Sequence, residues 1–193
     1  MASKIKVDTL ETANGSGTIA LSNQLSGMTT ASLPTLTSAE MPSGSVLQVV
    51  KYQTGAVDTG TTVIPHDDTI PQITEGEEFM TLAITPKNTS SLLKIDVVMY
   101  CTMSGGNYMI SALFQDTTAD ALAAINVPLA QGVNWTNSLS YTHYMTAGTI
   151  SATTFKVHGG ANSAATFTFN GQSGGRIYGG VAASSITITE IQA

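Results

Sequence analysis

Residues 92–101 read LLKIDVVMYC, and this segment decides the fold class. Every second side chain in it belongs to an apolar set: Leu93, Ile95, Val97, Met99 and Cys101. A strand with one buried face alternates with a period of two, whereas an amphipathic helix repeats about every 3.6 residues. The segment therefore predicts a β-strand that buries this set in a core and turns the charged Lys94 and Asp96 outward.

The same alternation recurs along the chain on both sides of this segment. It is found in VLQVVKY (46–52), FMTLAITP (79–86), NYMISALFQD (107–116), ALAAINVPL (121–129), NSLSYTHYM (137–145), TTFKVHG (153–159), ATFTFNG (165–171) and SSITITEI (184–191). Clusters of Gly, Asn, Asp and Pro separate these runs, and no stretch has a convincing helical period. Roughly eight to ten short antiparallel strands predict an all-β, two-sheet jelly-roll sandwich, which limits exposed strand edges.

The first 43 residues differ from this pattern. They hold short apolar pieces between Gly, Ser, Thr and Pro, and such pieces bury too little area to form a core of their own. We therefore predict an extended N-terminal arm over residues 1–43 and a head domain over residues 44–193. The arm residues expected to attach the protein to a partner are Ile5, Val7, Leu10, Ile19 and Leu21.

Charge and cysteine content exclude several classes of partner. The 193 residues carry 7 basic and 13 acidic side chains, a formal charge of −6, which argues against binding to nucleic acid or to an anionic membrane. No run approaches the roughly 20 apolar residues of a membrane span, so no membrane insertion is expected. The single cysteine, Cys101, excludes an intrachain disulfide framework and is expected to be a buried thiol.

The segment IPHDDTIPQITEGEE, residues 64–78, is called the acidic loop below; it concentrates carboxylates in a chain that is otherwise poor in charge. Pro65 and Pro71 predict a rigid loop. Three interpretations stay open: a structural turn in which Asp67 or Asp68 accepts backbone N–H bonds, a bound cation, or an acid/base pair. Arg176 is the expected partner of one of these acids, within a subunit or between subunits.

Other candidate residues carry weaker signals. The segment GSGTIA (15–20) fits a dinucleotide-binding pattern only loosely, and no strand–helix–strand context follows it. His143 shares the inward side of its run, whereas His158 has outward parity beside Lys156. Trp135, in the polar run QGVNWTNS (131–138), either caps the core or is the candidate receptor contact, because aromatic rings near Asn and Thr are common in sugar-binding surfaces.

Several of these segments together resemble a known family. The head resembles a domain of virion proteins from tailed phages, marine phages in particular, in IPHDDTIPQITEGEEFMTLAITP (64–86), ALFQDTTADALAA (112–124), TFTFNGQSGGRIYGG (166–180) and SSITITEI (184–191). Residues 1–34 are similar to the attachment segment of proteins described as tail fibres in such phages. The resemblance implies a tumour-necrosis-factor-like jelly roll, assembled as a homotrimer at the virion surface after synthesis in the host cytoplasm. His66 stands where the family has Tyr or Phe, which weakens a catalytic interpretation of this histidine.

No serine nucleophile elbow, pair of catalytic carboxylates or metal-ligand spacing stands out, so we expect a non-enzyme without catalytic residues, metal or cofactor. The first hypothesis is a short tail fibre or receptor-binding appendage, whose arm binds other virion proteins and whose head contacts a host glycan or protein. The alternative is a capsid decoration protein that stabilises the shell as a trimer.

Overall fold

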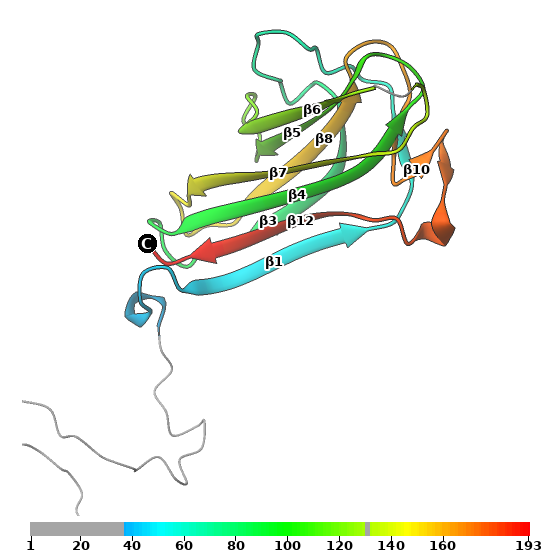
Figure 1. The fold of residues 1–193 in the computed structure, drawn as a ribbon. Coiled ribbons are helices and arrows are strands. Elements are labelled where there is room, and N and C mark those ends of the chain that lie inside the picture. Colours follow the sequence, from blue (N-terminus) through cyan, green and yellow to red (C-terminus); the bar gives the residue numbers. More distant parts are fainter. Residues whose placement is uncertain (1–36, 130–131) are drawn as a thin grey trace, which may run out of the picture. The chain divides into compact units, whose positions relative to one another are not determined.

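The computed structural model of the protein describes residues 37–129 and 132–193 (Figure 1). Thr37–Ala193 form one compact unit, which includes residues 37–43 of the predicted arm; from here on, the arm means residues 1–36 and the head means this unit. Its strands are β1 (Val46–Thr54), β2 (Asp58–Gly60), β3 (Glu77–Ile84), β4 (Leu92–Met103), β5 (Tyr108–Gln115), β6 (Ala123–Pro128), β7 (Asn137–Thr146), β8 (Thr153–Ala161), β9 (Phe167–Phe169), β10 (Gly171–Gln172), β11 (Gly175–Arg176) and β12 (Ser184–Ile191). Two short 3₁₀ helices, η2 (Ser38–Glu40) and η3 (Tyr178–Gly180), accompany them.

The strands form two main antiparallel sheets. The first, called sheet one, has the order β1-β12-β4-β9-β2, with β7 pairing on the other side of β4. The second, called sheet two, has the order β3-β8-β5-β6, and β10 pairs with β11 in a separate hairpin. The predicted fold class, an antiparallel two-sheet jelly-roll sandwich, is confirmed.

The alternation in residues 92–101 sets the position of the main core. All five residues of the predicted inward set on β4 are 0% exposed. Across the sheet, Ile95 faces Ile188 of β12 and His143 of β7. Phe79 of β3 closes the core from sheet two, with its ring 4.9 Å from the ring of Phe169. Each large apolar side chain buried in this way contributes about 1.5–3 kcal/mol relative to an exposed one.

A second, smaller apolar layer lies on the outer face of sheet two. Ile110 and Phe114 of β5 point away from the main core, yet both are buried, and the acidic loop supplies the buried Ile64 to this layer. Ile64 N–H donates to Ala161 O at 3.1 Å, which ties the loop to β8. Burial on both faces therefore replaces the simple in–out alternation in β5 and β8.

A glycine permits this close approach of the acidic loop. A Cβ atom on Gly160 would lie 2.8 Å from Thr62 O and 3.0 Å from Ile64 Cγ1, both shorter than ordinary contacts. Glycine at a strand interior commonly marks such a place, where another backbone approaches the sheet. The acidic loop is thus part of the packed structure of the head.

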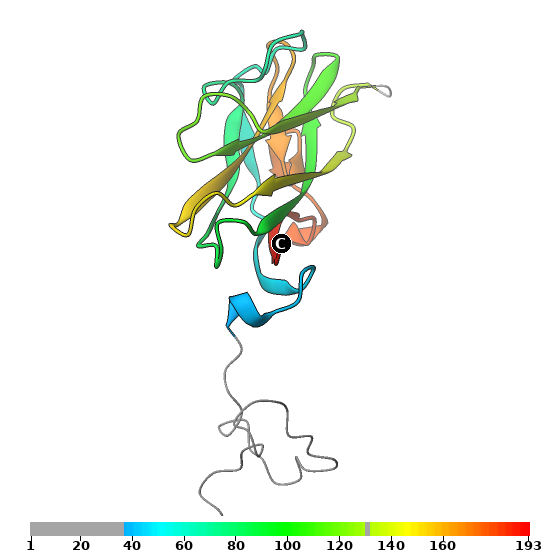
Figure 2. The same cartoon turned by 90° about the vertical axis from the view of Figure 1, so that its left-hand side faces the viewer.

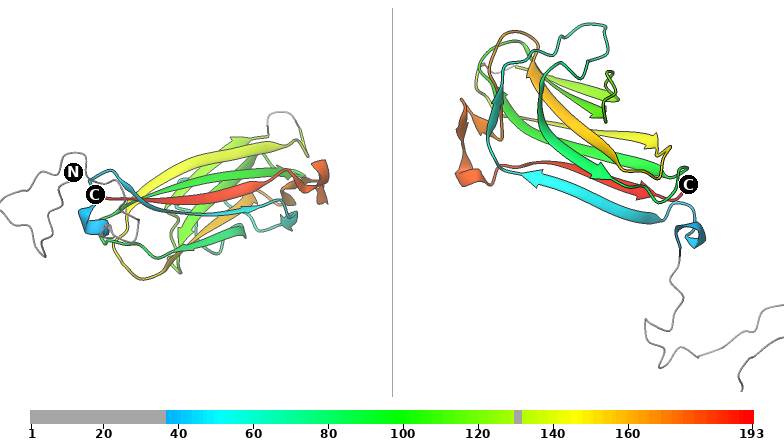
Figure 3. Two further views of the ribbon diagram at one scale, coloured as in Figure 1. Left: turned by 90° about the horizontal axis from the view of Figure 1, so that it is seen from below. Right: turned by 180° about the vertical axis from the view of Figure 1, so that it is seen from behind.

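The two ends of the head differ. At one end, called the near end, Gly44 N–H donates to Gln192 O at 2.8 Å, so the start of β1 lies beside the C-terminus. Figure 2 shows η2 and the C-terminus at this same end. The opposite end is called the far end. It holds the turn 104–107, residues 132–136 and the hairpin of β10 and β11. Figure 3 (left) shows β7, β4, β12 and β1 side by side, with this hairpin away from the C-terminus.

Candidate functional site

The acidic loop contains a hydrogen-bonded turn at Asp67. Thr69 N–H and Thr69 Oγ1–H donate to Asp67 Oδ1 at 2.9 and 2.5 Å. These bonds, the side-chain bond first, hold the pKa of the Asp67 carboxyl below its ordinary value. Asp68 is exposed on the same turn. The geometry at Asp67 is that of a side chain closing a turn on its own backbone.

The other carboxylates of the acidic loop have separate partners. Glu75 Oε2 accepts the N–H of Gln72 at 2.9 Å, and Glu77 Oε2 accepts the hydroxyl of Thr62 at 2.9 Å. Glu78 pairs with Lys156 at 3.1 Å. In residues 37–129 and 132–193, no three His, Cys, Asp or Glu side chains are grouped so that they could hold a metal ion.

Arg176 lies on β11 of the far-end hairpin and is exposed. The ion pairs found among the described residues join Lys94 to Asp96 and Lys156 to Glu78. The predicted pairing of Arg176 with an acid of the same subunit is therefore not formed in this structure. Its pairing across a subunit contact stays a prediction.

The acidic loop borders two surface hollows beside β6. His66 stacks on Tyr108, with ring centroids 4.0 Å apart and an angle of 8° between the ring planes. The stack lies near a hollow of 190 Å³ that Asp67 and Asn126 also line. A second hollow, of 310 Å³, lies around Ile70. His66 thus contributes a ring that stacks on Tyr108 next to the Asp67 turn.

His158 lies on the predicted outward side of its strand but is not exposed to solvent. Its parity is outward as predicted, but its side chain is only 5% exposed because the acidic loop covers it. His158 Nδ1 lies 3.0 Å from Glu75 O, and since a carbonyl only accepts, Nδ1 carries the proton. His158 Nε2 is buried without a hydrogen-bond partner among the described residues, and the imidazole ring centroid lies 4.7 Å from that of Phe114.

The other two candidate titratable residues lie in sheet one. Cys101 is buried as predicted, and desolvation raises the pKa of its thiol. His143 is half-buried, and desolvation lowers the pKa of its imidazole. Neither residue has a neighbouring acid or base in the described structure that would activate it for chemistry.

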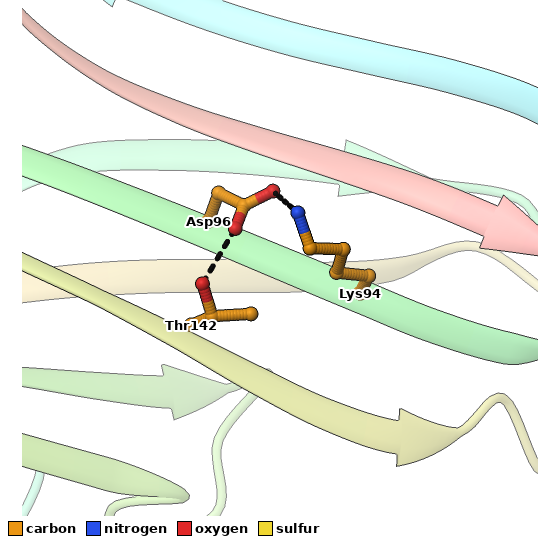
Figure 4. Close-up of polar contacts among 3 residues, drawn as sticks. All are labelled: Lys94, Asp96 and Thr142. Atoms are coloured by element: carbon orange, nitrogen blue, oxygen red, sulfur yellow. Dashed lines mark hydrogen bonds and ion pairs between the residues drawn. The ribbon is translucent and has the colours of Figure 1, made fainter.

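The outer face of sheet one carries a polar centre among apolar side chains. Figure 4 shows Lys94 Nζ donating to Asp96 Oδ2 at 2.7 Å and Thr142 Oγ1 donating to Asp96 Oδ1 at 2.6 Å. Burial would raise the pKa of Asp96, but these two hydrogen bonds lower it. Around this centre the face exposes apolar side chains, namely Val46, Val49, Leu92, Val98 and Tyr144.

The far end carries exposed aromatic side chains beside a hollow. Trp135 is 55% exposed and Tyr178 is 73% exposed. This hollow, called the far-end hollow below, has a volume of 240 Å³. It is lined by Ser104, Asn134, Thr166, Thr168, Ser173 and Gly174. Of the predicted site residues, Trp135 lies in the loop that borders this hollow, whereas Asp67 and Asp68 lie on the acidic loop.

A buried carboxylate was missed by the sequence analysis. Glu190 is 0% exposed; its Oε1 accepts the N–H of Lys87 at 2.7 Å and its Oε2 accepts Gln48 Nε2 at 2.6 Å. Burial would raise its pKa, but these hydrogen bonds hold it below the ordinary value. The sequence contains a signal for this position, because Glu190 has the same parity as the core residues Ile186 and Ile188.

The predicted attachment residues lie in a part of the chain that the structure does not describe. Ile5, Val7, Leu10, Ile19 and Leu21 all precede Thr37 and so fall outside the described residues. No helix in the described ranges has the length and apolar character needed to cross a bilayer. The role of the arm therefore stays a prediction.

Comparison with known proteins gives structural likenesses but no sequence match. No family model and no curated protein sequence matches the chain. Among solved structures, Eiger TNF from S. frugiperda is 10% identical with a TM-score of 0.42, over 74% of this chain and 92% of that one. The sugar-binding C-terminal domain of EclA is 14% identical with a TM-score of 0.33, over 81% and 99% of the two chains.

A chain from infectious bursal disease virus, Gt strain, is 11% identical with a TM-score of 0.36, over 77% of this chain and 39% of the viral one. The structural neighbours thus include a TNF and a viral protein. All three TM-scores are below 0.5. The strands, sheets and core described above define the protein as an antiparallel jelly-roll protein.

Proposed function

We propose that the protein is a subunit of a phage virion appendage, a short tail fibre or receptor-binding protein. In this proposal the arm binds other virion proteins, and the head, assembled as a homotrimer on the virion surface, contacts the host. The virion is assembled in the host cytoplasm. The proposal starts from the resemblance of residues 1–34 and of the head segments to tailed-phage proteins.

The observation that carries the proposal is the difference between the two ends of the head. The chain enters the head at η2, and Ser45 O accepts the N–H of Gln192 at 2.9 Å at this near end. The exposed Trp135 follows Asn134, which is bonded to Met103 and to Gln172 of the far-end hairpin, and the exposed Tyr178 lies in η3 directly after that hairpin. A protein held through its N-terminal segment would present this far end to its surroundings, as an attachment protein requires.

The outer face of sheet one supports the homotrimer within this proposal. Exposed Val49, Leu92 and Val98 lie on neighbouring strands of one face. At the centre of this face Lys94 and Asp96 pair with each other, while Lys51 on the edge strand β1 is a further exposed charge of the same face and forms no ion pair with the described residues. Another copy can cover the apolar centre of this face if Lys51 stays at the rim of the contact or pairs with an acid of the other copy.

The proposal is of a binding protein and not of an enzyme, because carboxylates of the head are engaged in hydrogen bonds within the fold. Asp67 closes a turn, Glu75 accepts a backbone N–H, and Glu190 joins three chain segments. Carboxylates engaged in this way serve the fold. We therefore propose no catalytic residue, metal or cofactor.

The second candidate function is capsid decoration, and the near end provides an observation in its favour. Ile150, in the loop between β7 and β8, is 61% exposed, and Val46 at the start of β1 is 55% exposed. Apolar side chains close to the point where the chain enters the head would suit a trimer that packs its near end against a shell.

An electron-microscopy map of purified particles separates the two functions. Particles with the wild-type protein are compared with particles assembled without it. The appendage proposal expects the difference density at the tail, with three-fold symmetry and the far end pointing away from the particle. Density distributed over the shell, with the near end against it, would establish decoration and exclude the appendage.

A further inference from the structure

The floor of the far-end hollow consists of hydroxyl groups held in fixed positions. Thr168 is 1% exposed, and its Oγ1 accepts the N–H of Gly174 at 3.1 Å. Ser104 Oγ accepts the N–H of Thr166 at 2.9 Å. Because each oxygen already accepts a backbone bond, each O–H proton is left to donate into the hollow.

The rim of the hollow has an arranged backbone. Asn134 and Ser173 adopt positive φ angles of 62° and 51°, which are uncommon for residues other than glycine. Asn134 N–H donates to Met103 O at 2.8 Å, and Gln172 Nε2 donates to Asn134 O at 2.6 Å. Unusual backbone conformations held by such bonds are frequent at binding sites, where they fix groups before the ligand arrives.

The lining indicates the charge and size of a ligand. The six lining residues offer hydroxyl, amide and backbone groups, and none carries a formal charge. The chain as a whole has a charge of −6, which disfavours an anionic ligand. The volume of 240 Å³ is below the roughly 300–1,000 Å³ of most small-molecule sites. A small, neutral ligand with several hydroxyl groups fits these properties.

Trp135 adds an exposed apolar surface next to the lining residue Asn134. It follows Asn134 directly in the chain, and its side chain is 55% exposed. The indole lies beside Gly132, where a Cβ would be 3.8 Å from Trp135 Nε1, an ordinary contact distance. A sugar ring has an apolar face of C–H groups and an edge of hydroxyl groups, and an indole beside a set of hydroxyl donors can bind both.

We propose that the far-end hollow binds one neutral sugar unit, such as a hexose or an N-acetylhexosamine, at the end of a host-surface glycan, with Trp135 packed against the sugar ring. The sugar class follows from the hollow itself. That the glycan belongs to the host rests on the proposed function.

The experiment uses the full chain and its only tryptophan. Because Trp135 is the single Trp of the sequence, the intrinsic fluorescence reports directly on this rim. The protein is titrated with glucose, galactose, mannose and N-acetylglucosamine, and with N-acetylneuraminic acid as a charged comparison. At least one neutral sugar is expected to change the emission with a dissociation constant on the order of millimolar, and N-acetylneuraminic acid is expected to leave it unchanged.

Two variants test the assignment to the hollow. Thr166→Val removes one hydroxyl at nearly constant shape, and Asn134→Gly removes the amide while keeping the positive φ. Each is expected to weaken sugar binding about threefold to tenfold, the value of one or two hydrogen bonds. The matched control, Thr118→Val in the exposed turn after β5, is expected to bind like the wild type.

The outcomes distinguish the inference from the proposed function. Absence of any response to the neutral sugars, or an equal response of Thr166→Val and Thr118→Val, overturns the inference. If particles still attach to host cells in that case, the contact is to a protein and the proposed function stands. If the sugar binds as expected but Thr166→Val particles attach normally, the sugar site stands and its role as the receptor contact fails.

Discussion

The buried carboxylate of Glu190 is a charged group that holds parts of the fold together. The carboxylate is buried at the near end and accepts hydrogen bonds from Gln48, Lys87 and Asn88. It thereby connects β1, the loop after β3 and β12, which are far apart in sequence. A buried charge is tolerated only where donors replace the lost water, and here two backbone N–H groups and an amide do so.

We expect Glu190→Gln to destabilise the head by about 1–3 kcal/mol, because the new NH₂ group faces donors where an oxygen is needed. The measurement is urea unfolding at neutral pH. Glu77→Gln, at an exposed carboxylate, is the control and should stay within about 0.5 kcal/mol of the wild type. A Glu190→Gln protein as stable as the control would show that the carboxylate network contributes nothing.

The same carboxylate predicts a pH dependence. The folded-state pKa of Glu190 lies below the ordinary value of 4.5, so its contribution to stability is complete above pH 4.5 and is lost as the pH falls through the folded-state pKa. The difference in unfolding free energy between wild type and Glu190→Gln should therefore shrink as the pH is lowered below 4.5. A difference that is constant down to the acid transition would contradict this assignment.

At the scale of elements, the acidic loop acts as a cover for sheet two. Its Ile64 lies against Gly160 of β8, and Glu75 O accepts the bond from His158 beneath it. The carboxylates of the loop close turns or pair with neighbours. The concentration of acids is explained by the local bonds of this cover.

We expect Gly160→Ala to loosen this cover. The added Cβ would lie 2.8 Å from Thr62 O, a backbone atom that cannot move without shifting the loop. Overpacking of this kind costs about 1–3 kcal/mol, and hydrogen exchange should rise in residues 61–76 before it rises in β4. In Gly105→Ala the Cβ meets only Ala165 Cβ at 3.7 Å, so this control should leave exchange in residues 61–76 unchanged. Unaltered exchange in Gly160→Ala would show that the loop is not packed as described.

The long strands were predictable because each has a face that is at least partly buried, whereas the short strands β2, β10 and β11 show no alternation to predict them. The five inward residues of β4 follow from alternation alone, as do Ile186 and Ile188 of β12. The burial of His158 was not predictable, since parity says which face a side chain takes and not whether a distant loop covers that face. The far-end hollow was equally hidden, because Ser104, Asn134 and Thr168 meet only through the sheet topology. Trp135, a lone aromatic in a polar run, was the one part of that end with a signal in the sequence.

At the scale of the whole molecule, the homotrimer predicts a defined mass and a face that forms the contact. The full chain should sediment at three times 20.0 kDa. Val98→Lys would place an unpaired ammonium on the outer face of sheet one, in a contact that would otherwise bury apolar area, and should yield a folded monomer. Val181→Lys, the same change at an 82% exposed position of the far end, should leave the trimer intact. A wild-type chain that sediments as a monomer at micromolar concentration would exclude the trimer.

The last prediction concerns the division of labour between arm and head. We expect a chain lacking residues 1–36 to fold with an unchanged thermal transition, because the near-end bonds of Ser38 to Asn88 and of Gly44 to Gln192 are retained. The truncated protein should be absent from purified particles. Each deleted apolar arm residue would contribute about 1.5–3 kcal/mol when fully buried in a partner, and three arms per trimer would act together.

A full-length chain with Ile5→Ser and Val7→Ser separates the contribution of the side chains from that of arm length. If these side chains bind a virion groove or add a strand to a partner sheet, the double variant should also be depleted from particles, while its head unfolds like the wild type. Normal copy number of the truncated protein on particles would place the docking surface on the head, where the exposed Val46 and Ile150 of the near end would be the residues to change next. Loss of folding on truncation would instead make residues 1–36 part of the head's own stability, and the arm would then be a structural element and not an anchor.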